Sequence, residues 1–506
     1  MALEPDIPAR EPPSRGGFPT RRRGIRAWLA ELSSLERRER SRRLHEGLHA
    51  LNRLEIPARR RLAILEDLRP SVREILDYLA SRIQSQALPL PERARRIHDL
   101  NIELLREHAT GYAIVLAAEG PGGRRARIAL AAERALALHG EWMLRAAQVY
   151  ARVPEACWRA VNAVYDSAER AGVGARAVAD TELAEGGPGR QSPVAIYRRI
   201  LLFGLAGTQG LRRGEAARIY RELEHWGPDA HLGIDEGAVA GGVCFAVDLQ
   251  RPAGPAPFSA FSVSADSRLR VLQVDSPLED GHRIDAAALR RLLDSWRPAT
   301  HERAARAQRG EEVDAEVTLG VIVARLAAEL APEEQRPKRR QRLDAPGAAL
   351  TLQTIERDDE PGGTEASAGA AWGEVERGQD RTAGYAAARR AEARLDRENT
   401  RPEHPRWLLQ DVSATGYCLW WDSEGSSRAM VGELAALRLA PEERGEARWS
   451  IGVVRRMQFL DERRFEIGVH ALSRRAVPGR VRREPANPNR KRDRDHEPGE
   501  PALMLP

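Results

Sequence analysis

The residues best suited to chemistry form a short polar turn near the C-terminus. Asp411, Ser413 and Gly416 stand in a D-x-S-x-x-G pattern between two apolar stretches at 407–409 and 417–420. Asp and Ser side chains can hydrogen-bond to the backbone of a tight turn, and a glycine lets a ligand come close to the main chain. Most turns of this kind only connect strands. A binding turn and a plain connecting turn are therefore both open at this point.

An arginine-rich run lies upstream of this turn. Residues 336–342 read Arg-Pro-Lys-Arg-Arg-Gln-Arg. A guanidinium group can bind a phosphate with two hydrogen bonds, read the O6/N7 edge of guanine or stack on a base. An Asp carboxylate can accept from the N1 and N2 donors of guanine, and a Ser hydroxyl can donate or accept. Without the downstream turn, a solvated basic loop or a patch for nucleic-acid phosphates would be the better interpretation.

The two motifs together resemble the PilZ domain, a small β-barrel receptor for cyclic di-GMP. Arg336 and Arg340 are four residues apart, and the run 348–355 after them predicts a strand because its apolar residues alternate. Two later alternating stretches, at 449–457 and 465–471, resemble the closing strands of that barrel. The resemblance covers about residues 330–480 and implies that the arginine segment folds over a bound cyclic di-GMP. The ligand contacts that it implies are Arg336, Arg339, Arg340, Asp411, Ser413 and Gly416.

The arginine motif lies farther from Asp411 than in most PilZ domains. Residues 358–404 are rich in Gly, Ala, Glu and Arg with few large apolar side chains, which predicts a disordered insertion. Removing this insertion restores the usual spacing. An alternative takes Arg397 and Arg401 as the motif, but it leaves no room for a strand before Asp411.

Helical periodicity dominates the N-terminal part of the chain. Apolar residues recur at three- and four-residue steps between 44 and 79, and Pro57 and Pro91 mark two helix starts. This pattern predicts an all-α helical domain over 24–230, after a disordered segment 1–23. Further helices are expected at 92–118, 126–151, 155–172, 192–205 and 213–225.

A mixed α/β linking region is expected between the helical domain and the barrel, over 231–332. Strand-like runs lie at 242–249, 260–263 and 269–274, and helices are expected at 285–296 and 313–331. The barrel would then occupy 333–480, followed by a charged, Pro-rich tail over 481–506. The predicted fold class is therefore α+β multidomain, with a C-terminal PilZ-like antiparallel β-barrel.

Composition narrows the functional classes. The net charge of +6 is spread over 506 residues, which argues against nucleic acid as a partner. A nucleic-acid-binding protein that uses the arginine cluster on phosphates remains the alternative. Three widely spaced cysteines predict neither a disulfide framework nor a zinc site and favour the cytoplasm. No run is long and apolar enough to span a membrane. No catalytic motif is present, so neither an enzyme, a metal site nor a cofactor is expected.

The leading hypothesis is a non-catalytic cytoplasmic receptor. Its barrel would bind cyclic di-GMP, and its helical region would relay the second-messenger level to an unidentified protein partner. The layout is loosely similar to the FimW-like family of gammaproteobacterial receptors, which are linked to type IV pili, motility and surface attachment in biofilms. A scaffold whose barrel has lost its ligand is a further alternative.

Overall fold

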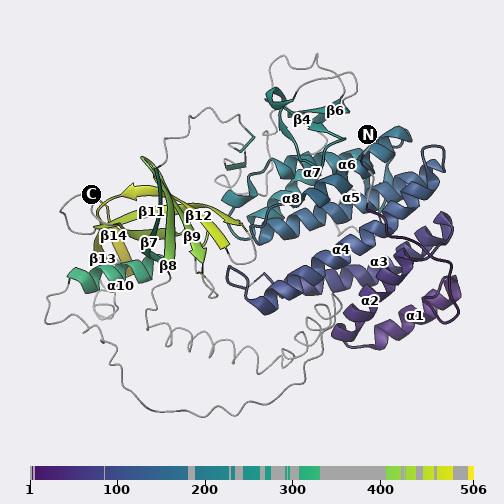
Figure 1. Ribbon diagram of the computed structural model, residues 1–506, viewed down its shortest axis with the longest axis horizontal. Helices are drawn as coiled ribbons and strands as arrows, with labels where there is room; N and C mark the ends of the chain where they lie inside the picture. Colours follow the sequence, from purple (N-terminus) through teal and green to yellow (C-terminus); the bar gives the residue numbers. More distant parts are fainter. Residues whose placement is uncertain are drawn as a thin grey trace, which may run out of the picture.

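The protein folds into a helical domain, a small sheet and a closed β-barrel (Figure 1). The computed structural model describes residues 3, 6–84, 86–180, 189–226, 230–233, 243–261, 268–274, 291–292, 295–296, 307–330, 406–422, 427, 429–439, 448–460, 464–481 and 500–505. One connected apolar core runs from the helices into the barrel. The α+β multidomain class expected from the sequence is confirmed.

The helical domain contains the helices that the apolar periodicity predicts. Leu44, Leu48 and Leu65 are fully buried within it, and Pro57 and Pro91 are the N-caps of α3 and α4. The helices are α1 (Arg22–Ser34), α2 (Arg37–Asn52), α3 (Ala58–Ser81), α4 (Glu92–Glu119), α5 (Arg125–Gln148), α6 (Glu155–Arg170), α7 (Pro193–Gly204) and α8 (Glu215–Trp226). A 3-10 turn, η1 (Thr208–Gly210), connects the last two.

The N-terminal segment is attached to the helical domain. The backbone of Glu11 donates to the carbonyl of Arg53 at 2.8 Å and accepts from the N–H of Glu55 at 2.7 Å. The disorder expected for 1–23 is therefore not observed at Glu11. Composition suggested disorder, but backbone hydrogen bonds to the loop between α2 and α3 fix this strand-like stretch.

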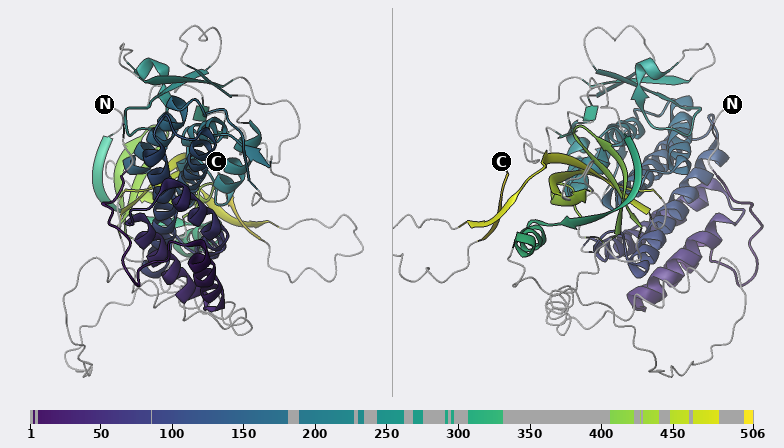
Figure 2. Two further views of the ribbon diagram at one scale, coloured as in Figure 1. Left: turned by 90° about the vertical axis from the view of Figure 1, so that its right-hand side faces the viewer. Right: turned by 60° about the vertical axis from the view of Figure 1, so that its left-hand side comes forward.

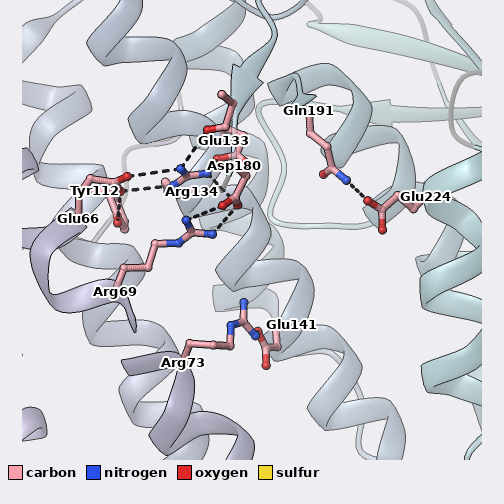
Figure 3. A network of polar contacts seen from close by, with 11 residues as sticks. Glu66, Arg69, Arg73, Tyr112, Glu133, Arg134, Glu141, Asp180, Gln191 and Glu224 are labelled. Atoms are coloured by element: carbon pink, nitrogen blue, oxygen red, sulfur yellow. Dashed lines mark hydrogen bonds and ion pairs between the residues drawn. The ribbon is translucent and has the colours of Figure 1, made fainter. Parts of the chain in front are cut away.

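A network of buried charges joins the helices around Asp180 (Figure 3). Asp180 accepts from Arg69 of α3 at 2.7 Å and from Arg134 of α5 at 3.0 Å. Arg134 also contacts Glu133 at 2.5 Å and Glu66 at 3.3 Å. Burial raises the pKa of the Glu133 carboxyl to about 7, the Asp180 carboxylate adds to the increase, and Arg134 opposes it. The network ties a two-stranded ribbon, β1 (Val178–Ala179) and β2 (Arg190–Gln191), to the helical core.

A four-stranded sheet follows the helices, with the order β3-β6-β4-β5. Its strands are β3 (Ala230–Gly233), β4 (Val243–Asp248), β5 (Ala256–Pro257) and β6 (Leu269–Val274). Two of them match the expected runs at 242–249 and 269–274. At 260–263 the prediction fails in part, because Phe258–Ala260 form a 3-10 turn, η4. Asn162 of α6 donates to the carbonyls of Arg251 and Ala253, which fixes the β4–β5 loop to the helices.

The barrel has six antiparallel strands in the closed order β10-β11-β12-β9-β8-β7. The strands are β7 (Ala307–Val317), β8 (Arg406–Ser413), β9 (Gly416–Asp422), β10 (Leu434–Leu439), β11 (Arg448–Phe459) and β12 (Arg464–Ser473). Their alternate residues fill the interior, among them Trp407, Leu419 and Phe465. The closing strands expected at 449–457 and 465–471 are therefore confirmed.

The first barrel strand is a correction to the sequence prediction. A helix was expected over 313–331, but β7 runs to Val317 and α10 covers only Leu319–Leu330. Val313 and Ala315 are buried and alternate with acidic neighbours, so this stretch has strand periodicity. Thr318 has φ +75, which separates strand from helix. The barrel thus begins within the range expected for the linking region. The predicted strand at 348–355 lies outside the described residues, and the barrel closes without it.

Part of the expected tail is also structured. Strands β13 (Val477–Val481) and β14 (Glu500–Met504) form a hairpin, although a tail was expected over 481–506. Leu503 packs against an apolar cluster that includes Ile322 and Leu326 of α10, and β14 contacts this helix. This apolar contact stabilises the hairpin, since an isolated pair of strands is only marginally stable in water. The hairpin projects outward from the barrel (Figure 2).

The barrel contacts the helical domain mainly through β11 and the β9–β10 connection. The Tyr150 carbonyl, after α5, accepts from the Phe459 N–H at 3.1 Å. The Leu88 carbonyl accepts from the Ser427 N–H at 2.7 Å. Gly210 of η1 lies against the Arg455 carbonyl, which is 3.4 Å from the position that a Cβ would take. These contacts extend the core across the two domains.

Candidate functional site

The D-x-S-x-x-G turn is the β8–β9 hairpin. The Ser413 hydroxyl donates to the Gly416 carbonyl at 3.2 Å, and the Thr415 carbonyl accepts from the Ala471 N–H at 2.9 Å. A Cβ on Gly416 would lie 2.2 Å from the Val469 carbonyl oxygen of β12. Glycine is required here because a neighbouring strand comes close, and the backbone has no positive φ. The turn is thus packed firmly onto the barrel wall.

A pocket of about 210 Å³ lies on the outer face of the barrel at this turn. Four strands contribute to it, and charged and hydroxyl side chains lie beside apolar surface there. The lining residues are Asp411, Ser413, Thr415, Gly416, Tyr417, Cys418, Arg455, Arg456, Gly468, Val469 and His470.

Strand register aligns the floor and walls of this pocket. Asp411 pairs with Cys418, Cys418 with Gly468, and Gly468 with Arg456. Directly paired residues share one face of a sheet, so these four residues form a row across β8, β9, β12 and β11. The row spans three inter-strand spacings, or about 14 Å. A carboxylate and a guanidinium therefore stand at opposite ends of the pocket.

Two β-bulges place these end residues on the outer face. The register shifts between Leu409 and Asp411, and again between Val454 and Arg456. Leu409, Val454 and Met457 all point into the core. An extra residue in a strand sets two successive side chains on one side, so Arg455 and Arg456 both face the pocket.

The side chain of Arg456 is held in position from three sides. A Cβ on Gly468 would lie 2.6 Å from its Cγ and Nε atoms, so the glycine makes room for the arginine to cross β12. Its guanidinium contacts Glu466 at 2.8 Å and the Cys418 sulfur at 3.8 Å. Glu466 in turn accepts from the Trp420 indole N–H at 3.2 Å.

The Cys418 thiol at the floor of the pocket is held in its neutral form. Burial raises its pKa to about 12, the Glu466 and Asp411 carboxylates add to the increase, and Arg456 opposes it. A neutral, buried thiol is a weak nucleophile. The described groups can therefore bind a polar ligand by charge and hydrogen bonds, with Cys418 as an unreactive floor.

The structure brings together three of the six expected ligand residues. Asp411, Ser413 and Gly416 line one pocket, as the resemblance implies. Arg336, Arg339 and Arg340 lie outside the described residues. The described lining is small for a cyclic dinucleotide, since ligand pockets usually enclose about 300–1,000 Å³.

Sequence reasoning missed the two arginines of β11. The available signal was the pair Arg455-Arg456 inside an otherwise alternating strand, because two adjacent charged residues there indicate a bulge. The register also shows that Gln308, the second residue of β7, pairs with Asp411. The first barrel strand therefore begins beside the turn at Asp411. Arg303 and Arg306 directly precede this strand in the sequence.

Neither a metal-ligand cluster nor a membrane-spanning helix is found among the residues that the structure describes. Within them, no group of three or more His, Cys, Asp or Glu side chains could hold a metal ion. No helix in the same part of the chain is long and apolar enough to cross a bilayer.

Known proteins resemble the chain over most of its length. Residues 23–236 match the family model "Cyclic-di-GMP receptor FimW, N-terminal domain", and residues 273–478 match "Cyclic-di-GMP receptor FimW, middle PilZ domain". The cyclic-di-GMP receptor FimW of Pseudomonas aeruginosa is 29% identical over 485 residues, which cover 90% of this chain and 77% of that protein. No solved structure matches the chain.

Proposed function

Because the chain belongs to the FimW family of PilZ-domain cyclic-di-GMP receptors, we propose that its barrel pocket binds cyclic di-GMP and that the protein acts as a non-catalytic receptor. The observation that carries the proposal is the pocket itself. Asp411, Ser413 and Gly416 gather on one face of the barrel, opposite two guanidinium groups.

Each residue in the proposed site has a role that follows from its chemistry. Asp411 accepts from the N1 and N2 donors of a guanine, and Ser413 supplies a hydroxyl at the turn. Gly416 places no side chain on the pocket wall, because β12 is too close to leave room for one. Arg336, Arg339 and Arg340 complete the site with forked contacts to the phosphates.

The helical domain is proposed to transmit ligand binding to a protein partner. It contacts β11, the strand that also carries the pocket arginines, through Tyr150 and Gly210. A ligand that binds one arrangement of this contact better than another shifts the population of both domains. We place the protein in the cytoplasm, where its helical region engages a protein partner in type IV pilus function, motility or surface attachment.

Calorimetric titration with cyclic di-GMP tests the proposed ligand. We expect wild-type protein to bind in the micromolar range or tighter, and Asp411→Ala to weaken binding about tenfold to a hundredfold, because hydrogen bonds to a charged group contribute about 1.5–3 kcal/mol. Glu312→Ala is the control, since it removes an exposed carboxylate of the same barrel outside the pocket. Absence of heat at high micromolar ligand, or equal losses in both variants, would refute the proposal.

A further inference from the structure

Arg455 differs from its neighbour Arg456 although both line the pocket. Arg456 is engaged by Glu466 and Cys418. Arg455 is exposed, and within the described ranges its guanidinium has no hydrogen-bond, ion-pair or ring partner. A cation that stays unpaired at a pocket wall is available for an anionic group of a ligand.

The backbone of Arg455 is fixed although its side chain is free. The flanking residue Val454 donates to the Glu433 carbonyl at 2.9 Å, and its own carbonyl accepts from the Gly432 N–H at 2.8 Å. On the other side, Gly210 of the helical domain packs against the Arg455 carbonyl. The bulge is therefore held between the barrel and the helical domain, so little backbone order has to be gained when a ligand arrives.

We propose that Arg455 directly contacts a phosphate of the bound cyclic dinucleotide. This assignment rests on the proposed function and adds to it a ligand residue outside the two PilZ motifs. Asp411, at the opposite end of the pocket, can accept hydrogen bonds from a guanine edge. The row of residues from Asp411 to β11 is about 14 Å long. A ligand whose guanine binds Asp411 would therefore have its phosphate-bearing ring over β11. A phosphate is the ligand group that gains most from an unpaired guanidinium, because both partners are charged.

Titrations with cyclic di-GMP at two salt concentrations test the assignment. We expect Arg455→Ala to weaken binding about tenfold or more at about 0.1 M salt, and Arg455→Lys to lose less because it keeps the charge. At about 1 M salt, where the Debye length falls to about 3 Å, the loss in Arg455→Ala should shrink. Arg474→Ala is the matched control, since Arg474 is an exposed arginine that directly follows β12 and lies outside the pocket lining.

The outcomes separate this inference from the proposed function. If wild-type protein binds and Arg455→Ala binds equally well, Arg455 has no ligand contact and the receptor function stands. Equal losses in Arg455→Ala and Arg474→Ala would show a general charge effect and overturn the assignment. A loss that does not change with salt would point to a guanine edge instead of a phosphate. If wild-type protein fails to bind, the proposed function itself fails. Thermal melting of both Arg455 variants establishes that the comparison is between folded proteins.

Discussion

At the residue scale, three groups of arginines besides Arg455 are candidates for the proposed phosphate contacts. Arg336–Arg342 follow α10, Arg397 and Arg401 precede β8, and Arg303 and Arg306 precede β7. The first group has the spacing that resembles the PilZ motif. The third directly precedes the strand whose second residue pairs with Asp411.

Single substitutions distinguish these groups. We expect Arg340→Ala to weaken cyclic di-GMP binding about tenfold or more, because phosphate oxygens lose a forked, charged donor. Arg401→Ala should have little effect and serves as the control. The measurement is calorimetric affinity at low salt. A larger loss in Arg306→Ala than in Arg340→Ala would move the motif to the start of β7, and abolition by Arg401→Ala alone would restore the alternative placement.

At the element scale, the charge network holds the β1–β2 ribbon on the helices. Asp180 is buried and directly follows the first strand of the ribbon, so its pairing with Arg69 and Arg134 replaces the water that it loses. Glu133 is buried beside this pair, and burial raises its pKa to about 7. The folded protein therefore holds the Glu133 proton more tightly than the unfolded chain.

This difference predicts a pH-dependent effect of Glu133→Gln. The contribution of the Glu133 proton to stability is complete below pH 4.5, the ordinary pKa of the group, and is lost as pH rises through about 7. Wild-type protein should therefore lose stability relative to Glu133→Gln over this window, by up to roughly 3 kcal/mol. Denaturant unfolding of both proteins between pH 4.5 and 8 measures the difference.

Glu31→Gln is the control for this experiment. It removes an exposed carboxylate of α1 and leaves the network intact. If both variants show the same pH dependence relative to wild-type protein, the Glu133 carboxyl does not titrate as its burial implies.

At the scale of the whole molecule, Tyr150 connects the two domains. Its backbone has φ +58, a conformation that non-glycine residues rarely adopt, and its carbonyl accepts from Phe459 of β11. The Tyr150 hydroxyl donates to the Leu211 carbonyl at 2.9 Å, next to η1. One residue thus holds both β11 and the turn that packs behind Arg455. A strained backbone conformation persists only where the surrounding structure holds it, so the contacts of Tyr150 with β11 and with Leu211 must maintain this φ value.

Hydrogen exchange measures whether this connection transmits ligand binding. We expect cyclic di-GMP to slow exchange at the β8–β9 turn, along β11 and at η1, because a ligand that binds only the folded pocket lowers the population of states in which β11 and its contact with η1 are locally open. In Tyr150→Phe, which lacks the bond to Leu211, protection at the turn should persist and protection at η1 should decrease. Helix α2 is the internal reference. Protection confined to the turn in wild-type protein would leave a binding domain without the proposed relay.

Many of the helices and strands can be predicted from the local periodicity of the sequence. Helices α3 to α8, strands β11 and β12 and the polar turn at Asp411 all follow from residue spacing, because helix and strand periods are properties of neighbouring residues. The turn and the arginine run were also sufficient to indicate a PilZ domain, which the family matches confirm. These features need no knowledge of distant contacts.

Which strands close the barrel, and which side chains meet at the pocket, depends on pairings that form only when the chain folds. The stretch from 307 to 317 is a strand because β8 and β10 pair with it on either side, and its sequence neighbours do not supply those partners. Arg455 and Arg456 face Asp411 through two bulges and the register of four strands. Register depends on pairings between residues far apart in the chain, and a shift of one residue turns every side chain to the opposite face.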